Sequence, residues 1–242
     1  MIRVFFIMTV CLGISGSLFA NDVTYKVNGK DYEGFYLKDK SDSPVMLLIH
    51  DWDGLTGYEK ERAKMLQKMG YSVFAADLFG KGIRPVEVKD RKQHTGELYK
   101  DREKMRQLLN GALTEARKLG LNGTKVVAAG YCFGGAAVLE WARSGATLNG
   151  FASFHGGLKT PKGQDYSKTK GQVVVFHGSA DDHIPLTDLA ALGAELEASG
   201  VSHELISYSG APHAFTVFES KNYHKVSDQK SWKRFTGFLQ EI

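Results

Sequence analysis

Residues 125–135 place a strict limit on the fold of this chain, because they read Lys-Val-Val-Ala-Ala-Gly-Tyr-Cys-Phe-Gly-Gly. The apolar run predicts a buried strand, and the glycines on both sides of Cys132 predict a sharp turn into a helix. Residues without Cβ let a strand and a helix approach closely at such a turn. This Gly-x-nucleophile-x-Gly pattern places a reactive side chain at the apex, where the positive end of the following helix favours a thiolate. The segment therefore predicts a thiol nucleophile on an α/β scaffold.

Strands and helices are expected to alternate along the rest of the chain. Residues 23–27 and 32–37 alternate around Asn28-Gly29, which predicts a β-hairpin with a type I′ turn. Short apolar runs predict buried strands at 45–49, 72–76, 125–129, 150–154, 172–176 and 202–208. Helices are predicted at 58–69, 97–119, 133–144, 186–199 and 224–239, with polar connections at 81–95 and 159–170. This order predicts an α/β fold, with a mostly parallel sheet, helices on both faces and an antiparallel N-terminal hairpin.

The first 20 residues have the pattern of a secretory signal peptide. Arg3 precedes an apolar run from Val4 to Leu12, and small residues follow up to Ala20. The run is too short to span a membrane, which takes about 20 residues. We therefore expect cleavage near Ala20, a single α/β domain over residues 21–242, and a periplasmic or secreted protein without membrane association after cleavage. The alternative is an N-terminal anchor that is not cleaved.

Charge and cysteine content narrow the choice of partners. The formal charge of the 242-residue chain is +4, and its Lys and Arg residues are scattered among acidic ones, so no nucleic acid partner is expected. Of the two cysteines, Cys11 lies in the predicted signal peptide, which leaves Cys132 without an intramolecular disulfide partner. An inert buried cysteine is the common alternative, but the flanking glycines favour a free thiol. No histidine–carboxylate set has metal-ligand spacing, so neither a metal nor an organic cofactor is expected.

A thiol nucleophile needs a base, and the base needs an acid that orients it. In this fold the acid should follow a late strand, and the histidine should follow the next strand along the chain. Residues 172–176 lead into Asp181 and Asp182, and residues 202–208 lead into Gly-Ala-Pro-His213. These positions fall at the carboxyl ends of strands, where open α/β sheets bind ligands. We expect Cys132, Asp181 and His213 to form the triad, with Asp182 as the alternative acid.

The segment after the first buried strand, His50-Asp-Trp-Asp-Gly54, is expected to complete the site. An oxyanion hole in this arrangement takes one N–H from the residue after the nucleophile and one from such an early loop. Phe133 and Trp52 are therefore the expected donors. Asp51 is then expected near the sulfur, where a carboxylate favours the protonated thiol or accepts its proton when substrate arrives. The alternative for this loop is a plain turn with capping acids.

These motifs resemble the dienelactone hydrolases, a branch of the α/β-hydrolases, over nearly the whole chain after the predicted signal peptide. The likeness rests on Gly130-Tyr-Cys-Phe-Gly-Gly135, Gly178-x-x-Asp181-x-x-Ile184-Pro185, Pro212-His-Ala-Phe215, residues 50–54 and the turn Asp77-Leu-Phe79. The resemblance implies the triad Cys132, Asp181 and His213, and it implies that Asp51 stands where the family usually has a glutamate against the resting thiol. His50, Lys81 and Tyr131 are further residues expected to bind substrate.

The chain departs from the family at two positions. Members that cleave dienelactone hold the substrate carboxylate with two arginines, and this chain has Val217 and Lys81 there. Because arginine and lysine are not interchangeable in such contacts, the resemblance supports the chemistry better than the substrate. We expect a carboxymethylenebutenolidase-like esterase or lactonase that forms an acyl-enzyme with a small-molecule substrate, as a monomer or homodimer. The alternatives are a thioesterase or amide hydrolase on the same triad, and a non-catalytic binding protein on the hydrolase fold.

Overall fold

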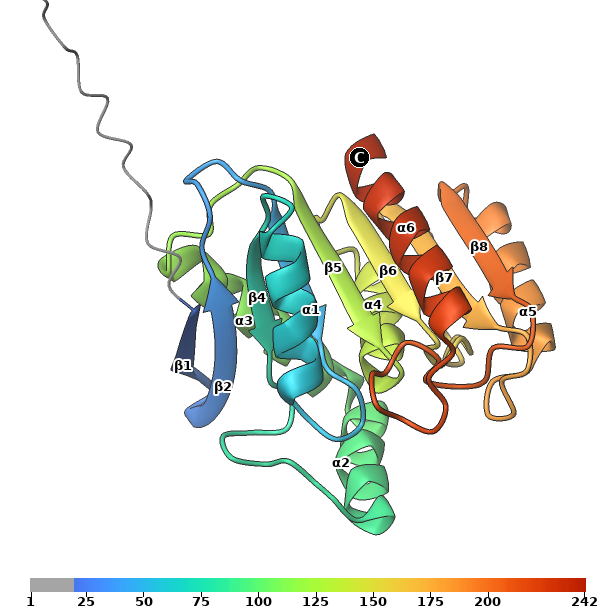
Figure 1. Ribbon diagram of the computed structural model, residues 1–242, viewed down its shortest axis with the longest axis horizontal. Coiled ribbons are helices and arrows are strands. Elements are labelled where there is room, and N and C mark those ends of the chain that lie inside the picture. Colours follow the sequence, from blue (N-terminus) through green and yellow to red (C-terminus); the bar gives the residue numbers. More distant parts are fainter. Residues whose placement is uncertain (1–19) are drawn as a thin grey trace, which may run out of the picture.

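The computed structural model describes residues 20–242, which form one eight-stranded sheet with helices on both faces (Figure 1). The strands are β1 (Ala20–Val27), β2 (Lys30–Leu37), β3 (Val45–Ile49), β4 (Ser72–Ala76), β5 (Val126–Tyr131), β6 (Gly150–Phe154), β7 (Gln172–Gly178) and β8 (His203–Tyr208). They lie in the order β1-β2-β4-β3-β5-β6-β7-β8. β2 pairs antiparallel with both β1 and β4, and all other pairs are parallel. The predicted fold class is confirmed.

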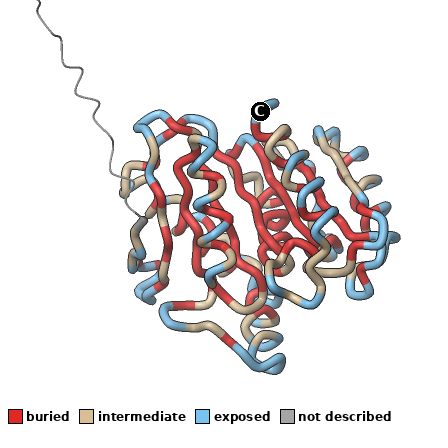
Figure 2. The backbone as a smooth tube through the Cα atoms, viewed as in Figure 1, coloured by how far each residue is buried: buried red, intermediate tan, exposed pale blue. Residues whose placement is uncertain are grey.

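The described residues form six helices: α1 (Gly57–Gln67), α2 (Val88–Lys100), α3 (Arg102–Lys118), α4 (Phe133–Arg143) and α5 (Leu186–Ala198) lie between strands, and α6 (Lys225–Glu241) follows β8. The core lies in two layers, one on each face of the sheet, and β3 shows how the layers divide. Val45, Leu47 and Ile49 pack into the layer under α3, α4 and α5, whereas Met46 and Leu48 pack into the layer under α1 and α6. Figure 2 shows the central strands as buried, as expected for parallel strands covered on both faces.

The prediction of one long helix at residues 97–119 is wrong, because two helices, α2 and α3, occupy this region. Asp101 leaves helical geometry, with φ −109° and ψ 78°, and its carboxylate accepts the N–H of Lys104 at 2.9 Å to cap α3. α2 also begins at Val88, so the end of the predicted polar connection at 81–95 is helical. The break has a consequence for the site, since it brings the ring of Tyr99 to 5.5 Å from that of Phe133.

The N-terminal hairpin forms with Asn28 and Gly29 at its turn. Their φ values of 50° and 79° are the left-handed conformations that a type I′ turn requires. β1 begins at Ala20, the residue near which we expect cleavage, and this residue pairs with Leu37. The rest of the predicted signal peptide, residues 1–19, lies outside the described residues. Within residues 20–242, the helices are too short or too polar to cross a membrane.

The parallel strands bring four distant segments of the chain to one edge of the sheet. The loops after β3, β5, β7 and β8 all leave from carboxyl ends of strands. These loops carry Asp51, Cys132, Asp181 and His213 respectively. The fold therefore places the predicted site residues at the edge where open α/β sheets bind their ligands.

Candidate active site

Cys132 lies at a tight turn between β5 and α4. Its φ of 48° is strained for a residue with a Cβ, and its N–H donates to the carbonyl oxygen of Phe154 at 2.9 Å, which fastens the turn to β6. A Cβ on Gly130 would lie 2.2 Å from the carbonyl oxygen of Gly134, and a Cβ on Gly134 would lie 2.3 Å from that of Ile49. Both glycines are therefore needed for the strand and helix to approach as closely as they do.

Three side chains from different loops form a chain of hydrogen bonds at this turn. His213 Nε2 lies 3.2 Å from Cys132 Sγ, and His213 Nδ1 lies 2.8 Å from Asp181 Oδ2. The other oxygen of Asp181 accepts two backbone N–H groups, those of His183 and Ile184, at 2.9 Å each. Although burial opposes ionisation, the hydrogen bond from His213 and its charge keep the pKa of Asp181 below its usual value. The geometry is that of a nucleophile, a base and an orienting acid.

The thiol of Cys132 is held in its protonated form. Burial raises the pKa of this thiol well above its usual value, and the hydrogen-bonded carboxylate of Asp51 raises it further. A hydrogen bond from the N–H of Phe133 lowers the pKa without compensating for these effects. The N–H of Phe133 at the helix N-terminus thus acts in the predicted direction, towards a thiolate, but burial and Asp51 outweigh it in the resting protein. The structure does bring Asp51 to the sulfur, as the loop motif predicted.

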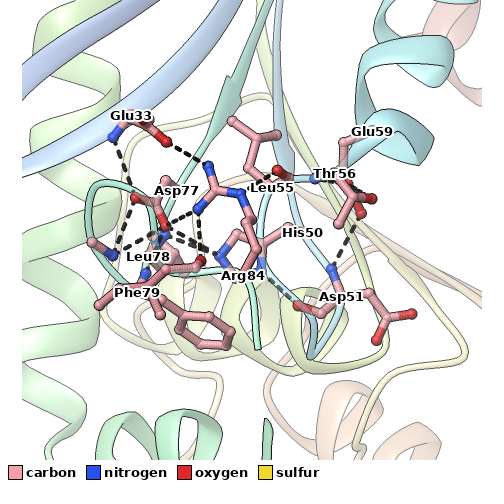
Figure 3. Close-up of polar contacts among 12 residues, drawn as sticks. Glu33, His50, Asp51, Leu55, Thr56, Glu59, Asp77, Leu78, Phe79 and Arg84 are labelled. Carbon is pink, nitrogen blue, oxygen red and sulfur yellow. Dashed lines mark hydrogen bonds and ion pairs between the residues drawn. The ribbon is translucent and has the colours of Figure 1, made fainter. Parts of the chain in front are cut away.

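Asp51 and Glu59 are both buried, and the Glu59 carboxyl group contacts the backbone of Asp51 (Figure 3). The N–H of Asp51 donates to Glu59 at 3.4 Å, and Glu59 also accepts the N–H of Thr56 at 2.8 Å in the capping box of α1. Burial raises the pKa of Asp51 to about 6 and that of Glu59 to about 7, and nearby acids add to both shifts. Asp51 is therefore able to take up or release a proton near neutral pH.

The two N–H groups predicted to bind an oxyanion are in different states. The N–H of Phe133 hydrogen-bonds to the sulfur of Cys132. The N–H of Trp52 donates to Asp51 Oδ1 at 2.5 Å. A donor engaged by a carboxylate is not free to bind a substrate oxygen. Whether the N–H of Trp52 is free to bind an oxyanion therefore depends on the charge and position of Asp51.

A buried network holds the loop that carries Asp51 (Figure 3). His50 Nδ1 donates to the carbonyl oxygen of Asp51 at 2.5 Å, and His50 Nε2 accepts the N–H of Leu78 at 3.0 Å. The carboxylate of Asp77 organises the neighbouring turn by accepting the backbone N–H groups of Glu33, Phe79 and Gly80. His50, predicted to bind substrate, is fully buried with both ring nitrogens engaged, so the structure places it behind the loop.

The other two predicted substrate-binding residues have different surroundings. Tyr131 is fully buried, packs edge-on against Tyr58 at 5.0 Å between ring centroids, and stacks on Phe154 at 4.9 Å. Lys81 is exposed beside the hairpin, where its N–H donates to the carbonyl oxygen of Asp31 at 3.0 Å. The structure therefore places Tyr131 in the core and Lys81 next to β2.

The sequence did not reveal a buried network that holds the loop of His213. Thr216 Oγ1 lies 2.8 Å from His155 Nε2 and 2.7 Å from the hydroxyl of Tyr58. Arg62, buried on α1, donates to the carbonyl oxygen of Thr216 at 2.9 Å. The same guanidinium pairs with Asp228 on α6. The loop of His213 is therefore fixed to two helices as well as to the sheet.

His155 is the member of this network that touches the triad. Its ring centroid lies 5.5 Å from that of His213, and its φ of 40° is strained for a side chain of this size. Burial keeps the pKa of His155 well below its usual value, and the charge of His213 lowers it further, so His155 is neutral. The only signal in the sequence was its position at the end of a strand.

The sheet order and the elbow define the class of protein. A parallel sheet with a nucleophile between strand and helix, followed along the chain by an acid and a histidine, is the arrangement of the α/β-hydrolases. Within residues 20–242, no group of three or more His, Cys, Asp or Glu side chains is placed to hold a metal ion.

The particular family follows from comparison with known proteins. Residues 33–242 match the sequence model of the dienelactone hydrolase family, and the chain belongs to this family. Two solved structures are similar over 94% of this chain and 99% of their own: m3DLH, with 26% identity and a TM-score of 0.87, and the dienelactone hydrolase-like promiscuous phosphotriesterase P91 from metagenomic libraries, with 28% identity and a TM-score of 0.85. An uncharacterised protein of Caenorhabditis elegans is 30% identical over 150 residues, which cover 54% of this chain and 95% of that protein.

The family assignment settles the broad activity. The chain is a hydrolase that acts on ester or lactone bonds, and its substrate is a small molecule. The alternative of a non-catalytic binding protein on the hydrolase fold is therefore set aside.

Proposed function

We propose that this chain is an exported esterase or lactonase in which Cys132 is the nucleophile, His213 the general base and Asp181 the acid that orients it. The proposal rests on one observation, the 3.2 Å contact from His213 to the sulfur together with the 2.8 Å contact from His213 to Asp181. An imidazole within reach of both a thiol and a carboxylate can move a proton and stay oriented while doing so. Export rests on the signal-peptide pattern of residues 1–20.

Acylation starts with a substrate carbonyl carbon next to the sulfur of Cys132. The thiol proton passes to His213 Nε2, a C–S bond forms, and the carbonyl oxygen becomes an oxyanion. The N–H of Phe133, which contacts the sulfur at rest, turns to this oxygen as the negative charge moves there. Collapse of the intermediate breaks the C–O bond, and His213 gives its proton to the departing oxygen. The product is an acyl thioester on Cys132.

Asp51 supplies a second proton acceptor and controls the other oxyanion donor. Its carboxylate contacts the thiol and accepts the N–H of Trp52 in the resting protein. If Asp51 takes the thiol proton when substrate arrives, a thiolate forms beside a neutral acid. The neutral acid holds the N–H of Trp52 less strongly, because hydrogen bonds to a charged acceptor are the stronger ones. Trp52 then becomes available to the oxyanion together with Phe133.

Deacylation reverses the proton movements. His213 takes a proton from a water molecule, and the resulting hydroxide attacks the thioester carbon. The C–S bond breaks, the sulfur regains a proton, and the carboxylic acid leaves. Each step uses the same imidazole, whose orientation depends on Asp181 and on the network through Thr216.

The test is hydrolysis of 4-nitrophenyl acetate by the wild type and by variants of the triad. We expect Cys132→Ala and His213→Gln to lose at least about a thousandfold in kcat/KM. Rapid quenching followed by peptide mass spectrometry should find an acetyl group on Cys132 of the wild type. The matched control is His203→Gln, because His203 lies at the start of β8, bonded to the carbonyl oxygen of Val201, and should leave the rate unchanged. Cleavage by Cys132→Ala at the wild-type rate contradicts the proposal.

A further inference from the structure

A pocket of about 260 Å³ adjoins the candidate active site, and Tyr99 of α2 forms part of its wall. Ala136 of α4, Gly157 of the loop after β6, and His183 of the loop after β7 line it as well. The ring of His183 lies 5.1 Å from that of His213, so the pocket opens beside the proposed base. Side chains in this wall are therefore placed to touch a substrate held at the thiol.

The ring of Tyr99 is held next to one of the predicted oxyanion donors, the N–H of Phe133. It packs edge-on against the ring of Phe133, with centroids 5.5 Å apart. The guanidinium of Arg102 lies over the ring of Tyr99 at 4.9 Å, and Arg102 Nε donates to the carbonyl oxygen of Tyr99 at 2.9 Å. These contacts fix the ring before a substrate binds, which is the condition for electrostatic catalysis by a side-chain donor.

The hydroxyl group of Tyr99 lies between α4 and the loop after β6. It is 3.9 Å from the position that a Cβ on Gly157 would occupy, and the Cβ of Ala136 is 3.5 Å from the same position. The hydroxyl of Tyr166 bonds to Arg143 at 2.7 Å, whereas that of Tyr99 has no hydrogen-bond partner within the part of the chain that the structure describes. It is therefore free to donate a hydrogen bond to a bound molecule.

The charges of the active site act on this hydroxyl. Burial of the group raises the pKa of Tyr99, and negative charge at Cys132 and Asp51 raises it further, while the charge of Arg102 lowers it without compensating. The group is therefore a neutral donor whose proton is attracted by negative charge at the thiol. Cys132 and Asp51 immediately precede the two residues whose N–H groups are the predicted oxyanion donors. The hydroxyl thus responds to charge at the place where an oxyanion would form.

Both predicted backbone donors are engaged in the resting protein. The N–H of Trp52 donates to the carboxylate of Asp51 at 2.5 Å, and the N–H of Phe133 hydrogen-bonds to the sulfur of Cys132. Each of them has to leave its present acceptor before it can bind a substrate oxygen. The hydroxyl of Tyr99 has no such acceptor to leave.

We propose that the hydroxyl group of Tyr99 is a third hydrogen-bond donor to the oxyanion, which makes Tyr99 a further catalytic residue. The inference rests on the proposed function, since the oxyanion forms when Cys132 attacks a substrate carbonyl. As the C–S bond forms, the thiol proton passes to His213 Nε2 and the π electrons of the C=O bond move to the oxygen. Tyr99 donates a hydrogen bond to this oxygen and keeps its proton, because burial holds the phenol in its neutral form.

The experiment compares two ketones of similar shape, phenethyl methyl ketone and phenethyl trifluoromethyl ketone, as inhibitors of 4-nitrophenyl acetate hydrolysis. The electron-poor carbonyl of the trifluoromethyl ketone adds the thiol of Cys132 and becomes an oxyanion, whereas the methyl ketone binds without forming the C–S bond. The ratio of their Ki values therefore measures stabilisation of the oxyanion. We expect Tyr99→Phe to lower the preference for the trifluoromethyl ketone about tenfold or more, as for loss of a hydrogen bond to a charged acceptor. The ratio does not depend on the fraction of the variant that is folded.

Ester hydrolysis gives a second measure. In Tyr99→Phe, kcat/KM should fall by about the same factor for 4-nitrophenyl acetate and for phenyl acetate, because the donor acts on the oxyanion and not on the leaving oxygen. A loss confined to phenyl acetate, which has the poorer leaving group, would mean that the hydroxyl assists the leaving oxygen, and it would overturn the proposal.

The matched control is Tyr36→Phe, which removes a hydroxyl from β2, where Tyr36 pairs with Phe74 of β4 and does not line the pocket. This variant should keep the wild-type ratio of Ki values and the wild-type rates. An unchanged ketone preference in Tyr99→Phe, or an equal change in both variants, overturns the proposal. If that happens while ester hydrolysis is still lost in Cys132→Ala, the proposed function stands and only the role of Tyr99 fails.

Discussion

Replacing Asp51 with Asn should stabilise the protein at pH 8 and change its stability little at pH 4. Burial raises the pKa of Asp51 from 3.8 to about 6, so the folded protein binds this proton more tightly than the unfolded chain does. The ionised form is therefore disfavoured by folding, and the wild type loses stability as the pH rises from about 4 through 6. Asparagine carries no charge at any of these pH values and keeps an oxygen that can accept the N–H of Trp52.

The size of the effect follows from the pKa values. A difference of about 2 pKa units corresponds to about 3 kcal/mol, and linkage predicts that the full difference is present above pH 7 and roughly half of it at pH 5. Because Asp51 is 7% exposed, solvent screening reduces this value little. Glu59 contacts the backbone of Asp51, and the ionisation of each carboxyl group affects the other. We therefore expect the variant to be more stable than the wild type by about 1–3 kcal/mol at pH 8.

Urea denaturation followed by tryptophan fluorescence at pH 4, 5 and 8 measures the difference. Asp182→Asn is the control, because Asp182 is an exposed aspartate in the loop after β7, and its replacement should change the unfolding free energy little at any pH. A stability difference for Asp51→Asn that is constant across pH, or a loss of stability at pH 8, would refute the reasoning.

Three other changes test separate parts of the site. Gly134→Ala places a Cβ 2.3 Å from the carbonyl oxygen of Ile49 in β3. Urea denaturation should therefore show that the free energy of unfolding falls by about 2 kcal/mol or more. Wild-type stability would mean that the backbone at this turn can shift at little cost. Thr216→Val removes the hydrogen bonds to Tyr58 and His155. Because His213 should then be misplaced, kcat for 4-nitrophenyl acetate should fall about tenfold. An unchanged kcat would show that Thr216 does not position His213. In Asp51→Asn, iodoacetamide should alkylate Cys132 at lower pH than in the wild type, because the carboxylate that raises the thiol pKa is gone; an identical pH profile would contradict this.

The parts of the site that the sequence predicted are those encoded by short local patterns. Glycines on both sides of Cys132 define the elbow, and Asp181 and His213 each follow a short apolar strand. Because the carboxyl ends of parallel strands meet at one edge, these patterns and their order were enough to predict that the three side chains would lie together. The two-sided burial of β3 likewise follows from its wholly apolar sequence.

The parts that the sequence did not predict depend on contacts between distant residues. Arg62, Thr216 and His155 come from three separate regions, and nothing in the neighbourhood of any one of them indicates the other two. The helix break at Asp101 was not predicted, because an acidic residue within an amphipathic run is typical of the solvent-facing surface of a helix. The thiol pKa could not be predicted, because the helix N-terminus and Asp51 act on it in opposite directions and the burial of the sulfur cannot be read from the sequence.

The contact of Arg62 with both α6 and the loop of His213 ties activity to the last element of the chain. The guanidinium reaches Asp228 on α6 and the carbonyl oxygen of Thr216, so undocking of α6 would release one of the restraints on the base. Parts of a domain commonly open in sub-global units before the whole domain unfolds. Heating should therefore abolish hydrolysis at a temperature where the central strands still protect their amides from hydrogen exchange, so that the C-terminal helix sets the working limit of the enzyme.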